Sequence, residues 1–278
     1  MRVKLFSMVK NEDDIVEDWI NYHGKIFGYN NLHIIDNYSD DDTYNILLKY
    51  KSKGIHIYRE RDYKIKGILL TRLINNERQK EDYNLAIPLD IDEFISYYDK
   101  EKNELIPSNT KSYICSEIGK NLNNSMYKCN YVNSLITTND NIGYNNVLRE
   151  CEYGKYTDYG NMAKTFVNVH NWHGQLDHGN HCCSEDYFLT DLVLVHYHTR
   201  NLEQIKKKVI ANISGFGYNQ NIDELNNLIQ TNPGIEGGHH ITKMIKILEN
   251  NFNIGSILEL PKGNIIVSLL PMKHFINN

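Results

Sequence analysis

Short apolar runs alternate with helix-like segments over the first ninety residues of the chain. The runs are rich in β-branched and aromatic residues, and the segments between them place apolar residues at helical spacing. The predicted strands are Val3–Val9, Leu32–Asp36, Ile55–Tyr58 and Leu85–Leu89, and helices are predicted from Ile15, over Thr43–Tyr50 and over Leu69–Gln79. This alternation predicts a mostly parallel sheet that is built from right-handed crossover units.

The second half of the chain is less regular. Three further apolar segments predict strands, and three segments near the C-terminus predict helices. The strands are Met126–Val132, Lys164–His170 and Leu192–His198, and the helices are Arg200–Ile213, Ile222–Gln230 and His240–Asn250. The pattern as a whole predicts an α/β fold with a mixed, mostly parallel sheet flanked by helices and followed by a C-terminal helical segment.

Two carboxylates follow the predicted strand Leu85–Leu89, at Asp90 and Asp92. Side chains alternate along a strand, so residues two apart share a face if the strand geometry continues through its tip. Paired carboxylates suit Mg²⁺ or Mn²⁺, and such an ion usually also holds substrate phosphates. The alternative is a solvated acidic turn, because this spacing of two aspartates is common.

Composition narrows the class of protein. The chain has 278 residues and 41% hydrophobic residues, enough for a large core in one domain with or without an appendage. The net charge is −5, and no long basic block indicates a nucleic-acid partner. No apolar run approaches the roughly 20 residues of a membrane span, and no signal peptide is visible. The five cysteines are odd in number and irregular in spacing, which argues against a disulfide framework.

Nucleotide-binding motifs of two common classes are absent from the sequence. Neither G-x-G-x-x-G nor G-x-x-x-x-G-K-[ST] occurs. A dinucleotide-dependent dehydrogenase and a P-loop enzyme are therefore disfavoured.

Five motifs carry a resemblance to a known group of enzymes. They are Phe6–Glu12, Trp19–His23, Ile35–Asp41, Leu89–Phe94 and His196–Arg200. Together they resemble the family 92 glycosyltransferases and the related family 2 type proteins, from the N-terminus to about Lys208. The middle of the chain and the segment after Lys208 carry little of this likeness.

The resemblance implies a GT-A fold and an inverting transfer of a hexose from a UDP-sugar, of the UDP-galactose or UDP-glucose type, to a glycan or glycoprotein acceptor. It also implies a divalent cation, Mn²⁺ or Mg²⁺. Residues 1–208 would form the GT-A domain, with a nucleotide-binding half at 1–100 and an acceptor-side half at 101–208. Residues 209–278 would form a helical extension that packs on the same domain.

The resemblance says less about the cellular compartment, the source organism and the oligomeric state. Relatives in the eukaryotic secretory pathway carry a membrane anchor that is not visible here. We therefore expect a cytoplasmic protein from a bacterium or, as the composition favours, a large DNA virus. The oligomeric state is open.

The resemblance also implies roles for individual residues. The metal would be held by Asp90, Asp92 and His196, with His198 and His170 as rivals of His196, and either Asp could contact ribose instead. The remaining nucleotide contacts would come from Lys10, Asn11, Glu12, Asp36, Arg72, Lys164 and Asp90 itself. The alternative for residues 10–12 is a helix-capping loop, and Arg72 and Lys164 could instead form ordinary ion pairs.

An inverting transfer needs a base that takes a proton from the acceptor hydroxyl. Asp177 is the first choice, and Glu185 and Asp186 are rivals in the same loop. This loop, Asn171–Asp186, is rich in histidine and cysteine, which also permits a zinc site. Its spacing matches no standard zinc finger, so an acceptor-binding loop with incidental histidines is the preferred interpretation.

Two other functions stay open at this point. One is a nucleotidyltransferase on the same kind of sheet, which the missing glycine-rich loop disfavours. The other is a non-catalytic module that binds a sugar nucleotide or a glycan.

Overall fold

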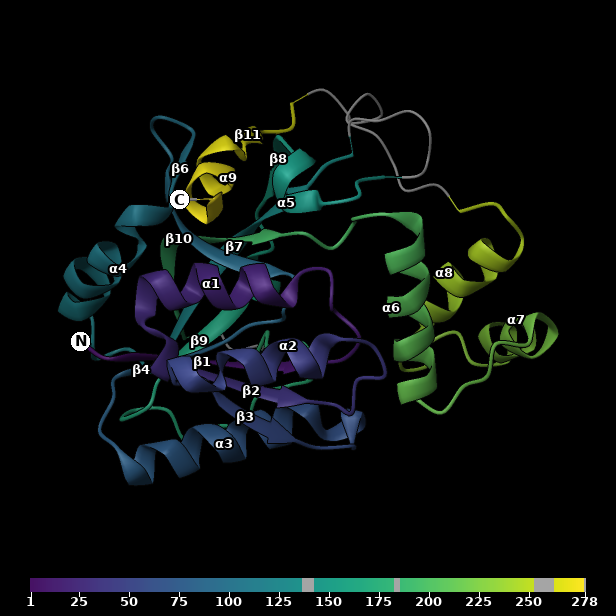
Figure 1. Cartoon of the computed structure of the whole chain (residues 1–278), viewed down its shortest axis with the longest axis horizontal. Helices are drawn as coiled ribbons and strands as arrows, with labels where there is room; N and C mark the ends of the chain where they lie inside the picture. The colour runs from purple at the N-terminus through teal and green to yellow at the C-terminus, as the bar shows by residue number, and fades with distance from the viewer. Residues whose placement is uncertain (137–142, 183–185, 253–262, 278) are drawn as a thin grey trace.

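A single mixed sheet of 11 strands forms the centre of the protein in a computed structural model (Figure 1). The structure describes residues 1–136, 143–182, 186–252 and 263–277. The main path through the sheet is β3-β2-β1-β4-β9-β7-β10-β5-β6, with β8 pairing with β7 and β11. Helices cover the sheet, so the expectation of an α/β fold with a mixed sheet flanked by helices is confirmed.

The first half of the chain forms the parallel part of the sheet. Its strands β1 to β4 pair in parallel in the order β3-β2-β1-β4. The strands are β1 (Val3–Val9), β2 (Leu32–Asp36), β3 (His56–Arg59) and β4 (Leu85–Pro88), and the helices between them are α1 (Val16–Phe27), α2 (Thr43–Tyr50) and α3 (Lys66–Lys80). The carboxyl ends of the four strands meet at one edge, where ligands of open α/β sheets bind.

The second half of the chain pairs largely antiparallel. Only β7 and β10 are parallel among its ladders in the described part of the chain. The strands are β5 (Glu93–Asp99), β6 (Glu104–Ile106), β7 (Met126–Ser134), β8 (Tyr153–Thr157), β9 (Lys164–Asn168), β10 (Phe188–His196) and β11 (Ile266–Ser268). The sheet therefore has more antiparallel pairing than the sequence pattern predicts, since short connections such as that between β5 and β6 need no crossover helix.

The two faces of the sheet pack against different helices. Leu5 and Val9 of β1 belong to the larger core cluster with residues of α1 and α2. Phe6 and Met8, on the opposite face of the same strand, pack in a second cluster with apolar residues of α3. This alternation follows from the period of two along a strand that is buried on both faces.

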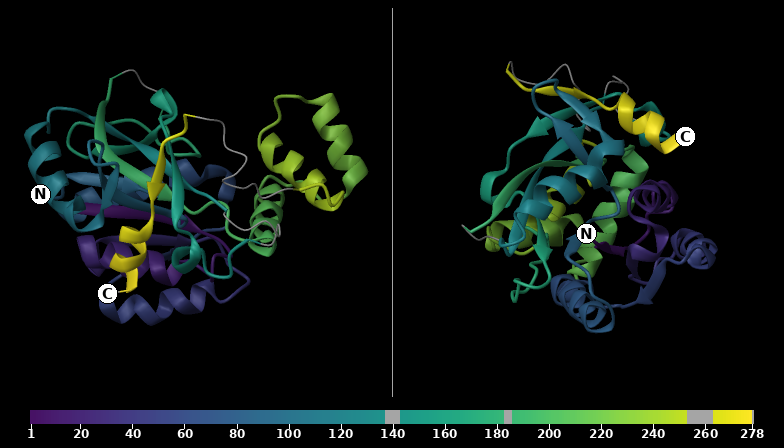
Figure 2. Two further views of the ribbon diagram at one scale, coloured as in Figure 1. Left: turned by 90° about the horizontal axis from the view of Figure 1, so that it is seen from above. Right: turned by 90° about the vertical axis from the view of Figure 1, so that its left-hand side faces the viewer.

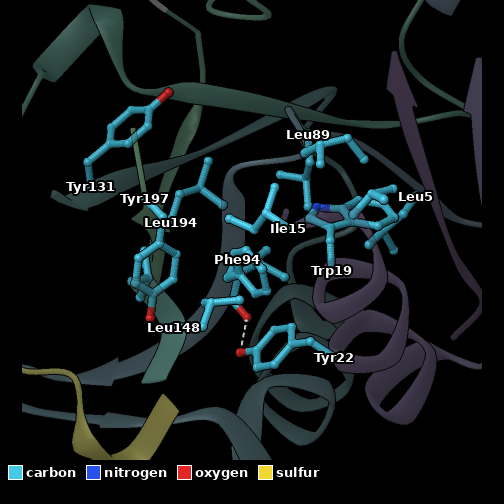
Figure 3. Packing of buried hydrophobic residues seen from close by; sticks show 14 of the residues in the cluster. Leu5, Ile15, Trp19, Tyr22, Leu89, Phe94, Tyr131, Leu148, Leu194 and Tyr197 are labelled. Atoms are coloured by element: carbon cyan, nitrogen blue, oxygen red, sulfur yellow. Dashed lines mark hydrogen bonds between the residues drawn. The ribbon is translucent and has the colours of Figure 1, made fainter. Parts of the chain in front are cut away.

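Helix α1 is also attached to β5, which begins directly after the acidic segment. The indole Nε1 of Trp19 donates to the Glu93 carbonyl (3.0 Å), and the Tyr22 hydroxyl donates to the Ile95 carbonyl (2.8 Å) (Figure 3). Both aromatic side chains are fully buried near Phe94. These contacts fix the start of β5 and therefore the position of the turn before it.

The C-terminal part of the chain forms a group of helices beside the sheet and then a strand and a helix that pack on the sheet domain. Helices α6 (Leu202–Gly215), α7 (Ile222–Thr231) and α8 (Gly238–Leu248) project together from one end of the sheet (Figures 1 and 2). The chain then returns, and β11 joins the sheet while α9 (Leu270–Asn277) packs against α1. The expected domain boundary at residue 208 lies within α6, and the segment after it includes a strand as well as helices. The division itself stays a prediction.

Two short helices complete the architecture, α4 (Thr110–Tyr113) and α5 (Val147–Glu150). No helix in the described ranges combines the length and the apolar character that a membrane crossing requires.

Candidate functional site

Asp90 and Asp92 lie in a tight turn between β4 and β5, which we call the acidic turn. The turn is closed by the Glu93 amide, which donates to the Asp90 carbonyl (3.0 Å), and by the Asp90 amide, which donates to the Glu93 carboxylate (2.8 Å). Strand β4 ends at Pro88, opposite Phe6. The predicted strand geometry through the tip is therefore wrong, and the two carboxylates have different partners.

Asp90 is paired with two lysines. Its carboxylate lies 2.5 Å from the ammonium of Lys66, the first residue of α3, and 3.1 Å from that of Lys164, the first residue of β9. Burial alone would raise the pKa of Asp90, but the charges of Lys164 and Lys66 outweigh burial and hold this pKa well below its ordinary value. The structure thus places Lys164 at the acidic turn, in an ion pair with Asp90, and its contact with a diphosphate stays a prediction.

Asp92 is almost fully buried and faces the end of β10 and the helix after it. Its carboxylate forms an ion pair with Lys208 of α6 and lies 3.4 Å from Nε2 of His196 and 3.8 Å from Nδ1 of His198. Burial would raise the pKa of Asp92, but Lys208 and His196 more than offset it and hold the pKa well below its ordinary value. Asp92 is therefore ionised at neutral pH.

Three of these side chains lie close enough together to hold a metal ion. Asp92, His196 and His198 each offer one ligand atom, and these atoms lie within 4.8 Å of one another. A carboxylate with two imidazoles suits a divalent transition metal such as Mn²⁺. The Lys208 ammonium beside Asp92 shows that the position accommodates a cation, so the residues fit the implied metal. Asp90 points to its two lysines instead, and its role as a metal ligand stays a prediction.

His198 is engaged on both ring nitrogens. While Nδ1 faces Asp92, Nε2 accepts a hydrogen bond from the Lys243 ammonium of α8 (2.9 Å). Burial lowers the pKa of His198 to about 3, although Asp92 opposes this shift. The ring is therefore neutral at physiological pH, which is the form that binds metals.

A cavity of about 470 Å³ lies beside the ends of β1 and β2, and we call it the strand-end cavity. Four cationic side chains contribute to its lining, namely Lys10, Arg61, Lys64 and Lys207. Tyr63, at the same cavity, lies within electrostatic range of both aspartates of the acidic turn, although burial is the main reason that its pKa is raised. Asp40 and Asp62 also line the cavity, so cationic groups outnumber anionic ones there without being alone.

Two of the expected nucleotide contacts line this cavity, Lys10 and Asn11. Asn11 adopts a positive φ of 56° and holds two strand ends together. Its amide donates to Ser39 Oγ (3.1 Å), and its side-chain oxygen accepts from the Asp40 amide (2.8 Å). Asparagine tolerates this left-handed conformation better than most residues, so the residue shapes the cavity as well as lining it.

Two more of the expected nucleotide contacts, Glu12 and Asp36, are buried and form ion pairs. Glu12 pairs with Arg200, which also binds Asp14 (2.6 Å), and lies 3.7 Å from the Lys208 ammonium. Asp36 accepts from Nε of Arg59 (2.9 Å). Both carboxylates stabilise the loops that form the cavity, and a direct role in binding stays a prediction.

Arg72 is not brought to the site. It is exposed on α3 and lines neither cavity beside the acidic turn, because the face of α3 that packs on the sheet carries Leu69, Leu70 and Leu73. Lys66, at the start of the same helix, reaches Asp90 instead. Lys66 was not predicted from the sequence. The one feature that could have indicated it is its position at a helix N-terminus, where a cation is unfavourable unless an anion lies nearby.

A second cavity of about 300 Å³ is lined by Asp90 itself, and we call it the Asp90 cavity. Charged and imidazole groups contribute to its lining, and so do larger, partly apolar side chains. These residues are Asp90, Glu93, Lys164, His181 and His196, together with Tyr131, Tyr159, Met162 and Gly179. Asp90 is 33% exposed at the side chain, so this aspartate is accessible from the cavity.

The residues proposed as the base lie elsewhere. Asp177 is exposed, and its carboxylate accepts hydrogen bonds from the amides of His181 (2.9 Å) and Cys182 (2.6 Å). It lines a separate hollow with Trp172 and His173. Asp186 is exposed and lines none of these cavities, and Glu185 lies outside the described residues. The assignment of the base stays a prediction.

The histidine- and cysteine-rich loop shows no zinc-like cluster among its described residues. His178 packs edge-on against Tyr63 (4.6 Å between ring centres), and His170 lies beside Asp82 (3.4 Å). His170 is therefore not at the acidic turn. These observations favour the loop with incidental histidines over a structural zinc site.

Comparisons with known proteins give distant likenesses. No family model matches the chain, and no curated protein matches it. Residues 1–349 of TarS from S. aureus are similar at a TM-score of 0.45 and 9% identity, over 90% of this chain and 71% of that one.

Two further structures are similar over a smaller part of the chain. Glucosyl-3-phosphoglycerate synthase from Mycobacterium tuberculosis, in complex with Mn²⁺ and UDP, has a TM-score of 0.31 and 15% identity over 47% of this chain and 44% of that one. The mannosyltransferase PcManGT from Pyrobaculum calidifontis, in complex with GDP-Man and Mn²⁺, has a TM-score of 0.31 and 13% identity over 46% of this chain and 35% of that one. Likenesses at this level establish no family membership.

Proposed function

We propose that the protein is a metal-dependent glycosyltransferase that moves a hexose from a UDP-sugar to a hydroxyl group of a glycan acceptor, with inversion. One observation carries this proposal. Asp92, His196 and His198 form a group suited to a divalent cation, at the sheet edge where strand ends and ligand sites of α/β folds coincide. The motifs of the acidic turn and of the end of β10 are also two of those that resemble the family 92 glycosyltransferases.

Each cavity then has a role in the reaction. The strand-end cavity has a cationic lining and amide groups from Asn11 and Asn37, which suit a nucleoside diphosphate. The Asp90 cavity lies where the transferred sugar and its acceptor would meet. We place the diphosphate between the two, beside the acidic turn.

The chain's own cations would stabilise the leaving group. A divalent ion at Asp92, His196 and His198 would neutralise the negative charge that develops on the departing diphosphate. Lys66, Lys164 and Lys208 already lie within contact distance of the acidic turn. Each ammonium is paired with a carboxylate of the turn or of Glu93, so phosphate oxygens would have to share or replace these ion pairs. Cations held beside the diphosphate would then stabilise the charge that develops in the transition state.

Inversion requires a base on the acceptor side that takes the hydroxyl proton. Asp177 remains our first candidate, with Glu185 and Asp186 as rivals. The bonds that Asp177 accepts from His181 and Cys182 would hold it in its loop, and part of this loop lines the Asp90 cavity through Gly179 and His181.

A second candidate function is a non-catalytic module that binds a sugar nucleotide. It is favoured by the ammonium groups of Lys208 and Lys243, which already contact two of the three metal-site residues, Asp92 and His198. In such a module the lysines would replace the metal and bind the diphosphate directly. Binding would then be independent of divalent ions.

Measurement of UDP release separates these functions. The protein is incubated with a panel of UDP-hexoses, with Mn²⁺ or with EDTA. We expect UDP release only with Mn²⁺, and a loss of at least roughly 100-fold in His196→Ala, because changes to residues that only support metal ligands already cost about 10- to 100-fold. The matched control is His274→Ala, an exposed histidine on α9. Saturable binding without release identifies a binding module, and the absence of both contradicts the proposal.

A further inference from the structure

We propose that the Asp90 cavity binds a pyranose ring, with the apolar face of the sugar on Tyr159 and Met162 and its hydroxyl groups on the polar floor beneath. This inference rests on the proposed function, because it assigns one carbohydrate of the transfer reaction to named residues. It goes further in naming the side chains that would contact the sugar ring and so determine which sugar is accepted.

The wall of the cavity consists of large side chains that are left in contact with water. Tyr159 is 44% exposed and Met162 is 50% exposed. Tyr159 meets the Tyr131 ring edge-on at 5.1 Å between ring centres, and Met162 lines the same cavity. Exposed apolar groups gathered beside polar ones are typical of ligand-binding sites. A pyranose ring presents a face of C–H groups that fits such a wall.

The floor carries charges that are already neutralised by one another. Lys164 is buried and lies 3.1 Å from Asp90 and 2.9 Å from Glu93. The Tyr131 hydroxyl donates to Glu93 (3.3 Å). A floor of paired charges gives no net attraction for a strongly charged ligand, yet offers many donors and acceptors. Hydroxyl groups, each of which can donate and accept, suit this surface.

Both walls are anchored before any ligand binds. The loop that carries Tyr159 and Met162 is held by the buried Lys128, whose ammonium donates to the Asn161 carbonyl (2.5 Å), and by the Tyr159 amide, which donates to Asn130 (3.2 Å). A cavity with fixed walls loses less conformational entropy on binding, which favours affinity.

The opposite wall is attached to the sheet through Thr165 of β9. The Thr165 amide donates to the Asn180 carbonyl (2.9 Å), and its hydroxyl donates to the His181 carbonyl (2.5 Å). Nδ1 of His181 is buried and has no hydrogen-bond partner, and Asn180 adopts a positive φ of 58°. Strain and unpaired polar atoms of this kind concentrate at functional sites.

The size of the cavity favours one sugar ring. At about 300 Å³ it lies at the lower end of the range for small-molecule sites, whereas the strand-end cavity, at about 470 Å³, is the larger one. The ring could belong to the UDP-sugar or to the acceptor, and the chemistry of recognition is the same for both.

Binding measurements on Tyr159→Ala and Met162→Ala test the inference. UDP and a panel of UDP-hexoses are titrated with Mn²⁺ present, and methyl glucoside, methyl galactoside and methyl N-acetylglucosaminide are added to the UDP-saturated protein. We expect about a tenfold weaker interaction with the sugar in each variant, which is the scale of one aromatic contact. UDP itself should bind as in the wild type. Tyr153→Ala is the matched control, because Tyr153 is 41% exposed on β8 but does not line the cavity.

The outcomes separate the two sources of the sugar and the two proposals. A loss confined to the UDP-hexoses assigns the ring to the donor, and a loss confined to the methyl glycosides assigns it to the acceptor; either result supports the inference. If UDP binds but the variants bind every sugar as the wild type does, or if no sugar adds to the binding of UDP, the inference is overturned and the nucleotide site stands. If UDP itself does not bind, the proposed function is overturned, and this inference with it.

Discussion

Lys208 of α6 forms an ion pair with Asp92, the buried carboxylate of the acidic turn, across 116 residues of sequence. The same ammonium lies 3.7 Å from Glu12, at the end of β1. A cation from the helical segment α6–α8 is thus placed where the proposed metal would be needed. Binding of a divalent ion at Asp92 must therefore compete with this ammonium or move it.

Replacement of this lysine should reveal the competition. In Lys208→Met, Asp92 loses its closest cation, and the free energy of unfolding without metal should fall by about 3 kcal/mol. Mn²⁺ should bind more tightly than to the wild type and should restore much of this stability. Urea denaturation with and without Mn²⁺ measures both effects.

A control for this substitution is available on the same helix. Lys206→Met removes an ion pair with Glu203 that lies at the surface, so its effect should be below about 1 kcal/mol. Equal free energies of unfolding for Lys208→Met and Lys206→Met without metal would show that the ion pair between Lys208 and Asp92 does not stabilise the fold.

The loop beside the Asp90 cavity depends on a glycine of α3. A Cβ atom at Gly67 would lie 2.2 Å from the Leu176 carbonyl oxygen and 2.7 Å from that of Asp177. Gly67→Ala should therefore displace the loop, lower the free energy of unfolding by about 1–3 kcal/mol and weaken catalysis more than UDP binding. Gly234→Ala, where nothing lies within 4 Å, is the control. Unchanged stability and turnover in Gly67→Ala would show that the loop does not rely on this close approach.

The pH dependence of stability should reflect a histidine in the core. His23 is fully buried on α1, and burial lowers its pKa to about 3. Because its pKa in the unfolded chain is about 6.5, the unfolded state binds the proton first as the pH falls. As the pH falls from 6.5 to about 3, His23 therefore lowers the free energy of unfolding by up to about 1.4 kcal/mol per pH unit.

Urea denaturation across this pH range checks the prediction. His23→Gln should reduce the slope of stability against pH, whatever it does to stability at neutral pH. His274→Gln, at an exposed position, should leave the slope as it is. If His23→Gln and the wild type show the same slope of stability against pH, protonation of His23 does not cause the loss of stability at low pH.

Asp177→Asn distinguishes a base from a loop cap. If Asp177 takes the acceptor proton, the variant should keep its melting temperature and UDP affinity and lose transfer by 100-fold or more, on the order of what general bases contribute. If it acts only through its bonds to His181 and Cys182, stability should fall and the remaining activity should keep its dependence on pH. Normal turnover would move the base to Glu185 or Asp186.

Much of the fold could be predicted because its periodicity is local. The four parallel strands and the helices between them lie close to the predicted segments. Three of the strands, β1, β2 and β4, are buried on both faces and therefore have continuous apolar runs. The antiparallel pairing of the second half could not be predicted, because pairing partners such as β7 and β9 are chosen by long-range packing. The pairing of β11 with β8 could not be predicted either, although residues 265–270 form an apolar run, because the partner strand is chosen by long-range packing.

Only part of the candidate site could be predicted, because some of its residues lie at strand ends and others on helices. Asp92 and His196 meet as expected, because both lie at the same edge of the sheet. Lys66, Lys208 and Lys243 were missed, since a lysine on a helix gives no sign in the sequence of which carboxylate it will reach. Arg72 lies on an exposed face of α3 for a related reason, because a shift of a few residues along a helix changes the face on which a side chain lies. Its contact with the nucleotide stays a prediction.

The binding of UDP to the wild type and to Asp92→Asn, with Mn²⁺ or with EDTA, tests the central claim most directly. Isothermal titration should show UDP binding that Mn²⁺ strengthens at least tenfold in the wild type, and Asp92→Asn should abolish this increment while the fold of the metal-free protein is kept. The same metal-dependent increment in Asp92→Asn, or no effect of Mn²⁺ in the wild type, would contradict the account.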